Sequence, residues 1–332
     1  AGATYLRWFL PTMALQFAIA AMGAALQGTG IVKPTMVVQM LTVLVNVALT
    51  PVLVAGWLTG RPLGVAGAGL ATTLAAATGV VMMTAYFVKL EHYVRFDASL
   101  LRPRLAVLRR MLGIGIPAGG QFALMFVYMA VIYAVIGVFG PAAQAGFGVG
   151  WRRMQAVFLP AMAVAFAAPA IAGQNFGARD AGRVRQTFRT AALMSSGFML
   201  ALTLFCQWRP EWLVSGFSDD PEVLGVASLF LTIVSWNFVA AGLTFTASGM
   251  FQAMGNTLPA LAATATRLVT FAAPAFWLAS RPGFQIVHVW YLSVATVFLQ
   301  AVLSLALLHR EFGRRLRFPE TAPDPTPGPV PA

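Results

Sequence analysis

The feature that most constrains this chain is a series of long stretches that contain no charged residue. Aspartate, glutamate, lysine and arginine are absent from residues 8–32, 34–60, 62–88, 111–151, 154–178, 223–266 and 282–309. A membrane-spanning helix needs about 20 consecutive, mostly apolar residues, and each of these stretches is longer than that. The two longest must hold more than one span, or parts of two. The sequence therefore predicts a polytopic membrane protein.

The amount and placement of charge agree with this interpretation. Of the 332 residues, 59% are hydrophobic and only 10% are charged, whereas about 25% are charged in a typical soluble domain. The net charge of +12 would suit a protein that binds nucleic acid. However, the basic residues lie between the hydrophobic stretches and not on one soluble face. We therefore expect no nucleic-acid partner. The single cysteine, Cys206, excludes a disulfide within the chain and a cysteine-rich metal site.

Turn-forming glycines and prolines divide the apolar stretches into about nine spans. The predicted spans are residues 5–27, 35–58, 64–88, 112–138, 145–173, 187–207, 223–250, 258–280 and 286–308. Only helices and closed barrels satisfy their backbone polar groups in lipid, and these spans lack the alternation of a barrel strand. The predicted fold class is therefore an all-α polytopic bundle of about nine transmembrane helices.

The positive-inside rule orients this bundle. Fifteen basic residues fall in one alternating set of breaks: Lys33, Lys89, Arg95, Arg102, Arg104, Arg109, Arg110, Arg179, Arg183, Arg185, Arg189, Arg310, Arg314, Arg315 and Arg317. Four fall in the other set: Arg7, Arg61, Arg209 and Arg281. The first set is therefore expected in the cytoplasm together with the C-terminus. An inner-membrane, multi-pass location follows from the same bias.

An internal repeat points to two related halves. Gln27, Gly30 and Pro34 recur at an offset of 225 residues as Gln252, Gly255 and Pro259. Six predicted spans separate the two copies, so both have the same orientation in the membrane. Parallel halves related by an axis along the membrane normal are a pattern found in transporters. The second copy lies in a six-helix unit, whereas the first lies in a unit of three helices.

Four groups of residues, taken in order along the chain, resemble the MATE (multidrug and toxic compound extrusion) family of transporters. They are Asn46 and Pro51 with residues 64–71, residues 113–117, Pro160 with residues 169–178 and Arg183, and residues 251–256. Their order and spacing carry the resemblance over roughly residues 5–315. The resemblance implies a fold of twelve helices in two six-helix lobes, of which this chain would be helices four to twelve.

The expected domain organisation follows from the repeat and the resemblance. Residues 1–88 would be the second half of the N-terminal lobe, residues 89–111 a cytoplasmic connector, and residues 112–309 the C-terminal lobe. Residues 310–332 would be a basic and then proline-rich disordered tail. Because the first lobe would be incomplete, we expect the chain to be a fragment that does not transport by itself.

Polar residues within the predicted spans are the candidates for a substrate cleft. They are Gln121, Tyr128, Trp236, Asn237 and Arg267. Arg267 lies about ten residues into its span, roughly 15 Å deep at the helical rise, where an arginine is costly unless it pairs or faces a wet cavity. It would contact either substrate or a carboxylate in the cleft, or it would be a structural arginine bonded to backbone carbonyls. The family motif supplies Gly173, Gln174, Asn175 and Gly177, which we interpret mainly as a helix end.

The resemblance implies export of amphipathic or cationic small molecules in exchange for H⁺ or Na⁺. No aspartate or glutamate lies within any predicted span, so the coupling carboxylate is expected upstream of Ala1. The sequence has no phosphate-binding loop, no metal-ligand spacing and no nucleophile–base set, so we expect no enzyme, no cofactor and no metal. The expected protein is a monomer in contact with membrane lipid. A flippase for lipid-linked precursors, of the same wider superfamily, is the alternative.

Overall fold

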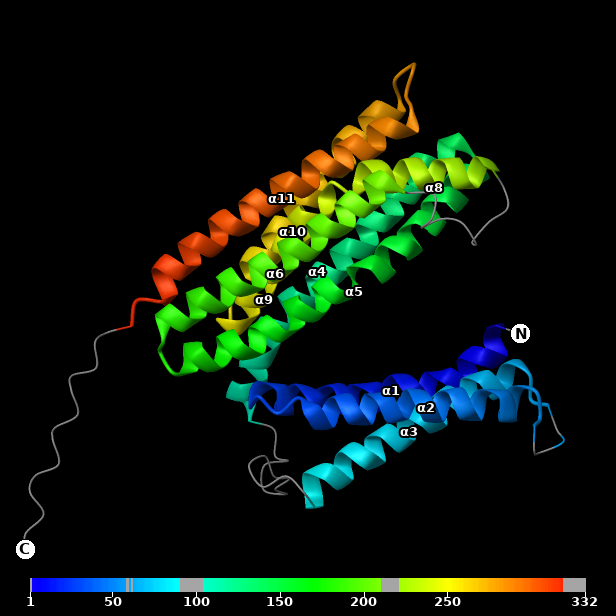
Figure 1. The fold of residues 1–332 in the computed structure, drawn as a ribbon, viewed down its shortest axis with the longest axis vertical. Coiled ribbons are helices and arrows are strands. Elements are labelled where there is room, and N and C mark those ends of the chain that lie inside the picture. The colour runs from blue at the N-terminus through cyan, green and yellow to red at the C-terminus, as the bar shows by residue number, and fades with distance from the viewer. Residues whose placement is uncertain (1, 58–59, 61, 90–103, 210–220, 319–332) are drawn as a thin grey trace, which may run out of the picture. The chain divides into compact units, whose positions relative to one another are not determined.

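The computed structural model describes residues 2–57, 60, 62–89, 104–209 and 221–318, and these residues form two separate units (Figure 1). The first unit contains α1 (Gly2–Gly28), α2 (Lys33–Val54) and α3 (Val65–Lys89). The second contains α4 (Leu105–Ile136), the short 3-10 helix η2 (Gly137–Phe139), α5 (Pro141–Gly177), α6 (Ala181–Trp208), α8 (Pro221–Val234), α9 (Asn237–Ala253), α10 (Leu258–Ala279) and α11 (Ile286–Arg315).

The described helices confirm the all-α polytopic fold. Eight are long and apolar enough to cross a membrane, and α8 with α9 makes a ninth span if this bent pair crosses as one. Large apolar side chains point outwards, as shown by Phe17 and Phe126, which are 78% and 76% exposed. Small polar groups lie inside instead, such as Thr12, whose hydroxyl is 2.8 Å from that of Thr73. Such a distribution suits a solvent of lipid chains.

Glycine allows close helix packing in the first unit, where α3 packs on both α1 and α2. A Cβ at Gly67 would lie 2.4 Å from the carbonyl oxygen of Leu53, and one at Gly69 would lie 2.8 Å from that of Tyr5. Larger residues would therefore push the helices apart. Within residues 64–71, which carry part of the family resemblance, Gly67 and Gly69 have this packing role.

The second unit is held together by an aromatic core. In Figure 1, α11 lies along α10, and the contacts show that α10 also packs on α4, while α9 packs on α5, α6 and α11. Trp290 of α11 stacks on Phe147 of α5, with ring centroids 5.6 Å apart, and meets Phe230 of α8 edge-on at 4.9 Å. Burying rings of this size fixes the helices against one another.

The span predicted over residues 223–250 is broken. Its two parts, Val223–Val234 and Asn237–Ala253, are bent by 60°. Two carbonyl oxygens at the break accept hydrogen bonds from α6 in addition to local ones: the Thr203 hydroxyl is 2.9 Å from the oxygen of Ser235, and the Gln207 amide nitrogen is 2.7 Å from that of Thr232. The break is stable in an apolar environment because side chains replace the lost helical bonds.

The backbone geometry supports the internal repeat. Gly30 and Gly255 both have positive φ, +85° and +71°. Each donates its N–H to the carbonyl of the repeated glutamine, Gln27 or Gln252, over 3.0 and 2.9 Å. In both copies, the residue after this glycine donates its N–H to the carbonyl five residues before it. The repeated sequence therefore forms the same glycine-terminated helix end.

One predicted domain end, at residue 88, falls at the end of a helix, whereas the other two fall inside helices. Residues 105–111, which we placed in the connector, form the first turns of α4, and residues 310–315 of the predicted tail continue α11. Residues 90–103 of the connector and 319–332 of the tail lie outside the described residues.

Candidate functional site

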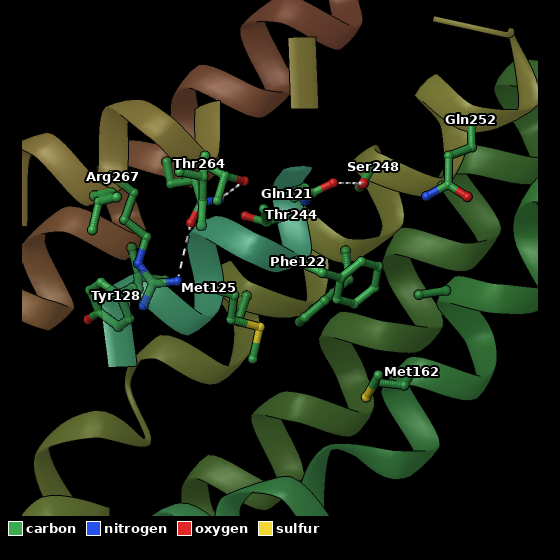
Figure 2. Close-up of a pocket in the computed structure, with 18 of the residues that line it drawn as sticks. Gln121, Phe122, Met125, Tyr128, Met162, Thr244, Ser248, Gln252, Thr264 and Arg267 are labelled. Carbon is green, nitrogen blue, oxygen red and sulfur yellow. Dashed lines mark hydrogen bonds between the residues drawn. The ribbon is translucent and has the colours of Figure 1, made fainter. Parts of the chain in front are cut away.

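A pocket of about 100 Å³ lies inside the second unit, among α4, α5, α9, α10 and α11. Gln121 and Tyr128 reach it from α4, and Arg267 reaches it from α10. Arg267 is the tenth of the 22 residues of α10, so the pocket lies near the middle of that helix. Three of the five cleft candidates therefore line one cavity (Figure 2).

Arg267 lies on one side of this pocket with two neutral neighbours. Its guanidinium carbon is 4.2 Å from the centre of the Tyr128 ring, a cation–π contact. One terminal nitrogen, Nη1, is 3.4 Å from Oε1 of Gln300, which is a long hydrogen bond. The Nε atom is buried and has no partner among the described residues. Arg267 is therefore neither paired with a described carboxylate nor bonded to described backbone carbonyls.

Tyr128 is fixed from two directions, which in turn fixes the position of the guanidinium. Its hydroxyl is 2.9 Å from that of Ser293 in α11, and its ring lies 4.7 Å from the ring of Phe271 in α10. Tyr128 is buried. It thus offers one ring face to Arg267 while its polar end is satisfied in the core.

Two further hydrogen-bonded pairs line the pocket. Ser248 of α9 donates to the Gln121 side chain over 3.0 Å, and the Gln300 amide donates to the Thr264 hydroxyl over 3.1 Å. Ser248, Thr264 and Gln300 are not among the candidates that the sequence indicated. Gln300 could have been found, because it is an amide side chain in the middle of an otherwise apolar span.

The rest of the lining is mostly apolar and flexible. Figure 2 shows Phe122 and Met125 between the Arg267 side of the pocket and Gln252, with Met162 below them. Phe166 and Phe245 add further aromatic surface. Methionine and phenylalanine side chains can fit apolar ligands of different shape. The pocket thus combines a cationic end with an adaptable apolar surface.

The other two cleft candidates lie elsewhere. Trp236 and Asn237 flank the break between α8 and α9 and do not line the pocket. Trp236 is exposed, whereas Asn237 is 5% exposed and its Oδ1 atom has no partner among the described residues. The sequence placed these polar side chains in a span but could not show that the helix breaks there.

The family motif forms the end of α5. The Asn175 side chain donates to the carbonyl of Ile171 over 2.8 Å, and the carbonyl of Asn175 accepts from the N–H of Asp180 at 2.9 Å. Arg179 turns the chain with a φ of +60°. Gly173 faces the end of α9 with room for a side chain, since a Cβ there would make an ordinary contact with the carbonyl of Ala253 at 3.9 Å. Gln174 and Gly177 lie in the same helix end.

Acidic groups are absent from the pocket lining. Among the side chains that the structure describes, Glu311 is buried, but it lies near the end of α11 and is paired with Arg315 at 2.5 Å and with Asn256 at 2.8 Å. No group of three or more potential metal ligands occurs within the described residues. The pocket is thus built to hold a molecule by its apolar surface, hydrogen bonds and one positive charge.

The fold and the pocket define the class of this chain: a multi-pass helical membrane protein whose larger unit holds a pocket among five helices. Residues 117–277 match the MatE family model. This stretch, just under half of the chain, is therefore similar to the MATE family, whose members are transporters and not enzymes. This confirms the resemblance that the sequence motifs indicated.

Two similar curated proteins are both named as probable multidrug resistance proteins. The chain is 25% identical over 260 residues to the "Probable multidrug resistance protein YoeA" of Bacillus subtilis, covering 77% of this chain and 56% of that protein. It is 23% identical over 288 residues to the "Probable multidrug resistance protein NorM" of Thermotoga maritima, covering 86% and 62%. The chain thus spans about six-tenths of the length of these relatives.

A solved structure has the same fold. The chain matches the "Outward-facing conformation of a multidrug resistance MATE family transporter of the MOP superfamily" with a TM-score of 0.87. The match covers 95% of this chain and 70% of that one, at 20% sequence identity. At this identity the likeness concerns the fold alone.

Proposed function

We propose that this protein acts in secondary active efflux, exporting amphipathic small molecules in exchange for H⁺ or Na⁺. The observation that carries the proposal is the pocket of the six-span unit, in which Arg267 and hydrogen-bonding amides face Phe122, Met125 and Phe166. Small-molecule sites combine mostly apolar walls with a few placed polar groups in this way. The multidrug-resistance names of the relatives support the same activity.

The location and the driving ion are parts of this proposal. Fifteen basic residues against four in the alternating breaks support an inner-membrane protein with a cytoplasmic C-terminus. Efflux driven by an ion gradient requires a group that binds the ion. No carboxylate lines the described pocket, so the group is expected in another part of the functional transporter.

Export is tested with the protein as produced from its own gene, reconstituted into proteoliposomes with the same concentration of a fluorescent amphipathic dye inside and outside. A pH gradient and a sodium gradient are imposed in separate experiments, and dye movement is recorded. We expect one of the two gradients to drive net movement of the dye. Phe122→Ala should lower the rate several-fold because it removes apolar contact surface from the pocket, whereas Phe17→Ala, at an exposed position of α1, should not. Movement without dependence on either gradient would contradict the proposal.

Arg267 also gives some support to the alternative, a flippase for lipid-linked precursors, because such lipids carry phosphate groups that arginine binds well. The helix end at Gly173, Gln174, Asn175 and Gly177 favours the drug exporters it resembles. The same proteoliposomes distinguish the two functions. Translocation of a polyprenyl diphosphate without dye transport would replace export by flipping.

A further inference from the structure

The charge of the pocket has a consequence for the kind of molecule that binds there. A guanidinium in the middle of a spanning helix is costly unless it is compensated. None of the residues that line the pocket is acidic, and Arg267 is the cation among them. The described ion pairs lie at Arg183 with Asp180 and at Arg315 with Glu311, both outside the pocket. Within the described residues, the positive charge of Arg267 is thus not neutralised.

Arg267 also has hydrogen-bonding capacity to spare. A guanidinium carries five N–H donors in a planar fork. Within the described residues, one of them makes the 3.4 Å contact to Gln300, and Nε is buried without a partner. The Gln300 amide nitrogen is directed to Thr264, so it does not compete for an acceptor on a ligand. A buried charged group with few acceptors is costly, and a ligand with acceptor oxygens at the terminal guanidinium nitrogens would lower this cost.

The neighbours of Arg267 fix it in place for such a ligand. The Tyr128 ring covers one face of the guanidinium at 4.2 Å and leaves its edge for in-plane hydrogen bonds, which are the geometry of carboxylate and phosphate recognition. The other polar side chains at the pocket, Gln121 and Ser248, bond to one another. They offer no negative charge that would hold a cation.

We propose that this pocket binds an anionic head group, of the carboxylate, sulfonate or phosphate type, at one end of an amphipathic substrate. Arg267 is the direct partner of the anion, Tyr128 is a positioning residue, and Phe122, Met125 and Phe166 contact the apolar body. The volume of about 100 Å³ is below the roughly 300–1,000 Å³ of sites for whole drug-sized ligands, which fits the seating of one end. The export of the bound molecule rests on the proposed function, whereas its binding to the pocket does not.

The test is a binding measurement that changes only the head group. Purified protein in nanodiscs of zwitterionic lipid is titrated calorimetrically with 2-naphthoate, with neutral 2-naphthamide and with cationic 2-naphthylmethylammonium. We expect naphthoate to bind about tenfold or more tightly than the amide, as a charge-assisted hydrogen bond provides, and the ammonium compound to bind most weakly. Arg267→Gln should remove the preference, and Arg267→Lys, which keeps the charge but loses the planar fork, should retain part of it.

A matched control is Arg281→Gln. Arg281 also stacks on an aromatic ring, 4.6 Å from that of Trp277, but it is exposed and does not line the pocket. This variant removes the same charge and should keep the preference for naphthoate. Equal affinity for the three compounds, tighter binding of the ammonium compound, or a preference that survives in a folded Arg267→Gln or is lost equally in Arg281→Gln would overturn the proposal.

Two sources of the anion are separated by repeating the titration in nanodiscs that contain an anionic phospholipid. If a lipid head group occupies the pocket, anionic lipid should weaken naphthoate binding to the unmodified protein, and Arg267→Gln should abolish that competition. If the ligand is a free small molecule, naphthoate binding should stay unchanged. Because binding is measured without an ion gradient, a failure of dye export would not contradict a preference for naphthoate. Likewise, the lack of such a preference would not contradict dye export.

Discussion

At the scale of single residues, Arg267 and Tyr128 depend on each other. The ring of Tyr128 lies below the guanidinium of Arg267, and the tyrosine hydroxyl reaches Ser293. The sequence indicated both residues only as polar groups in spans. Their contact stabilises both side chains: it partly compensates the charge of the arginine, and it fixes the orientation of the tyrosine ring.

The two contributions of Tyr128 can be separated by substitution. Tyr128→Phe keeps the ring and loses the bond to Ser293, so we expect it to lower the free energy of unfolding by about 1 kcal/mol, a typical value for a hydrogen bond between spanning helices. Tyr128→Leu also loses the cation–π contact, worth up to about 2 kcal/mol when desolvated, and should cost clearly more. Unfolding by increasing SDS in mixed micelles measures both.

The control for these variants is Tyr291→Phe, because Tyr291 is exposed. It should leave stability nearly unchanged. If Tyr128→Leu were no less stable than Tyr128→Phe, the contact between the ring and Arg267 would have no energetic value.

At the scale of elements, the break between α8 and α9 depends on a third helix. Residues 231–241 contain neither proline nor glycine, so no local signal predicts a bend there. The 60° bend exposes the carbonyls of Thr232 and Ser235, and Gln207 and Thr203 of α6 bond to them. A broken helix within a membrane is tolerated where neighbouring side chains replace its backbone bonds.

Thr203→Val tests this dependence while keeping the side-chain shape. It removes the side-chain donor to the Ser235 carbonyl, which keeps only the N–H of Phe238, so we expect a loss of about 1 kcal/mol in the free energy of unfolding. Thr187→Val in the same helix is the control, because the described bond of Thr187 goes only to the carbonyl of Arg183 in its own helix. Equal stability of the two variants would show that α6 does not stabilise the break.

At the scale of the whole molecule, the basic residues are distributed unevenly between the two alternating sets of breaks. The breaks on one side carry fifteen lysines and arginines and those on the other carry four. If basic loops remain in the cytoplasm, the end of α11 lies inside the cell and the turn between α10 and α11 lies outside.

Cysteine labelling tests this topology. In a Cys206→Ser background, which removes the single native cysteine, Ser280→Cys and Gly313→Cys each introduce a thiol at an exposed position. A membrane-impermeant maleimide should modify the Ser280→Cys protein in intact cells, and the Gly313→Cys protein only after lysis. The reverse pattern would show that the charge bias does not set the orientation.

The sequence by itself determined the membrane class, the approximate number and ends of the spans, the internal repeat and the resemblance to MATE transporters. Lipid makes this possible, because a chain without charge over about 20 residues has few alternatives to a spanning helix. Glycine at the repeated helix ends similarly fixed the local backbone, since Gly30 and Gly255 both need positive φ.

Only the tertiary structure decided which polar residues share a site. Spans that are apolar on all sides have no periodic face that reveals their interior, so the sequence ranked Gln121, Tyr128 and Arg267 together with Trp236 and Asn237. Packing brought the first three to one pocket with Gln300, and the break between α8 and α9 placed the other two outside it. These contacts join residues far apart in the chain, such as Tyr128 and Ser293, and they depend on side-chain fit between helices.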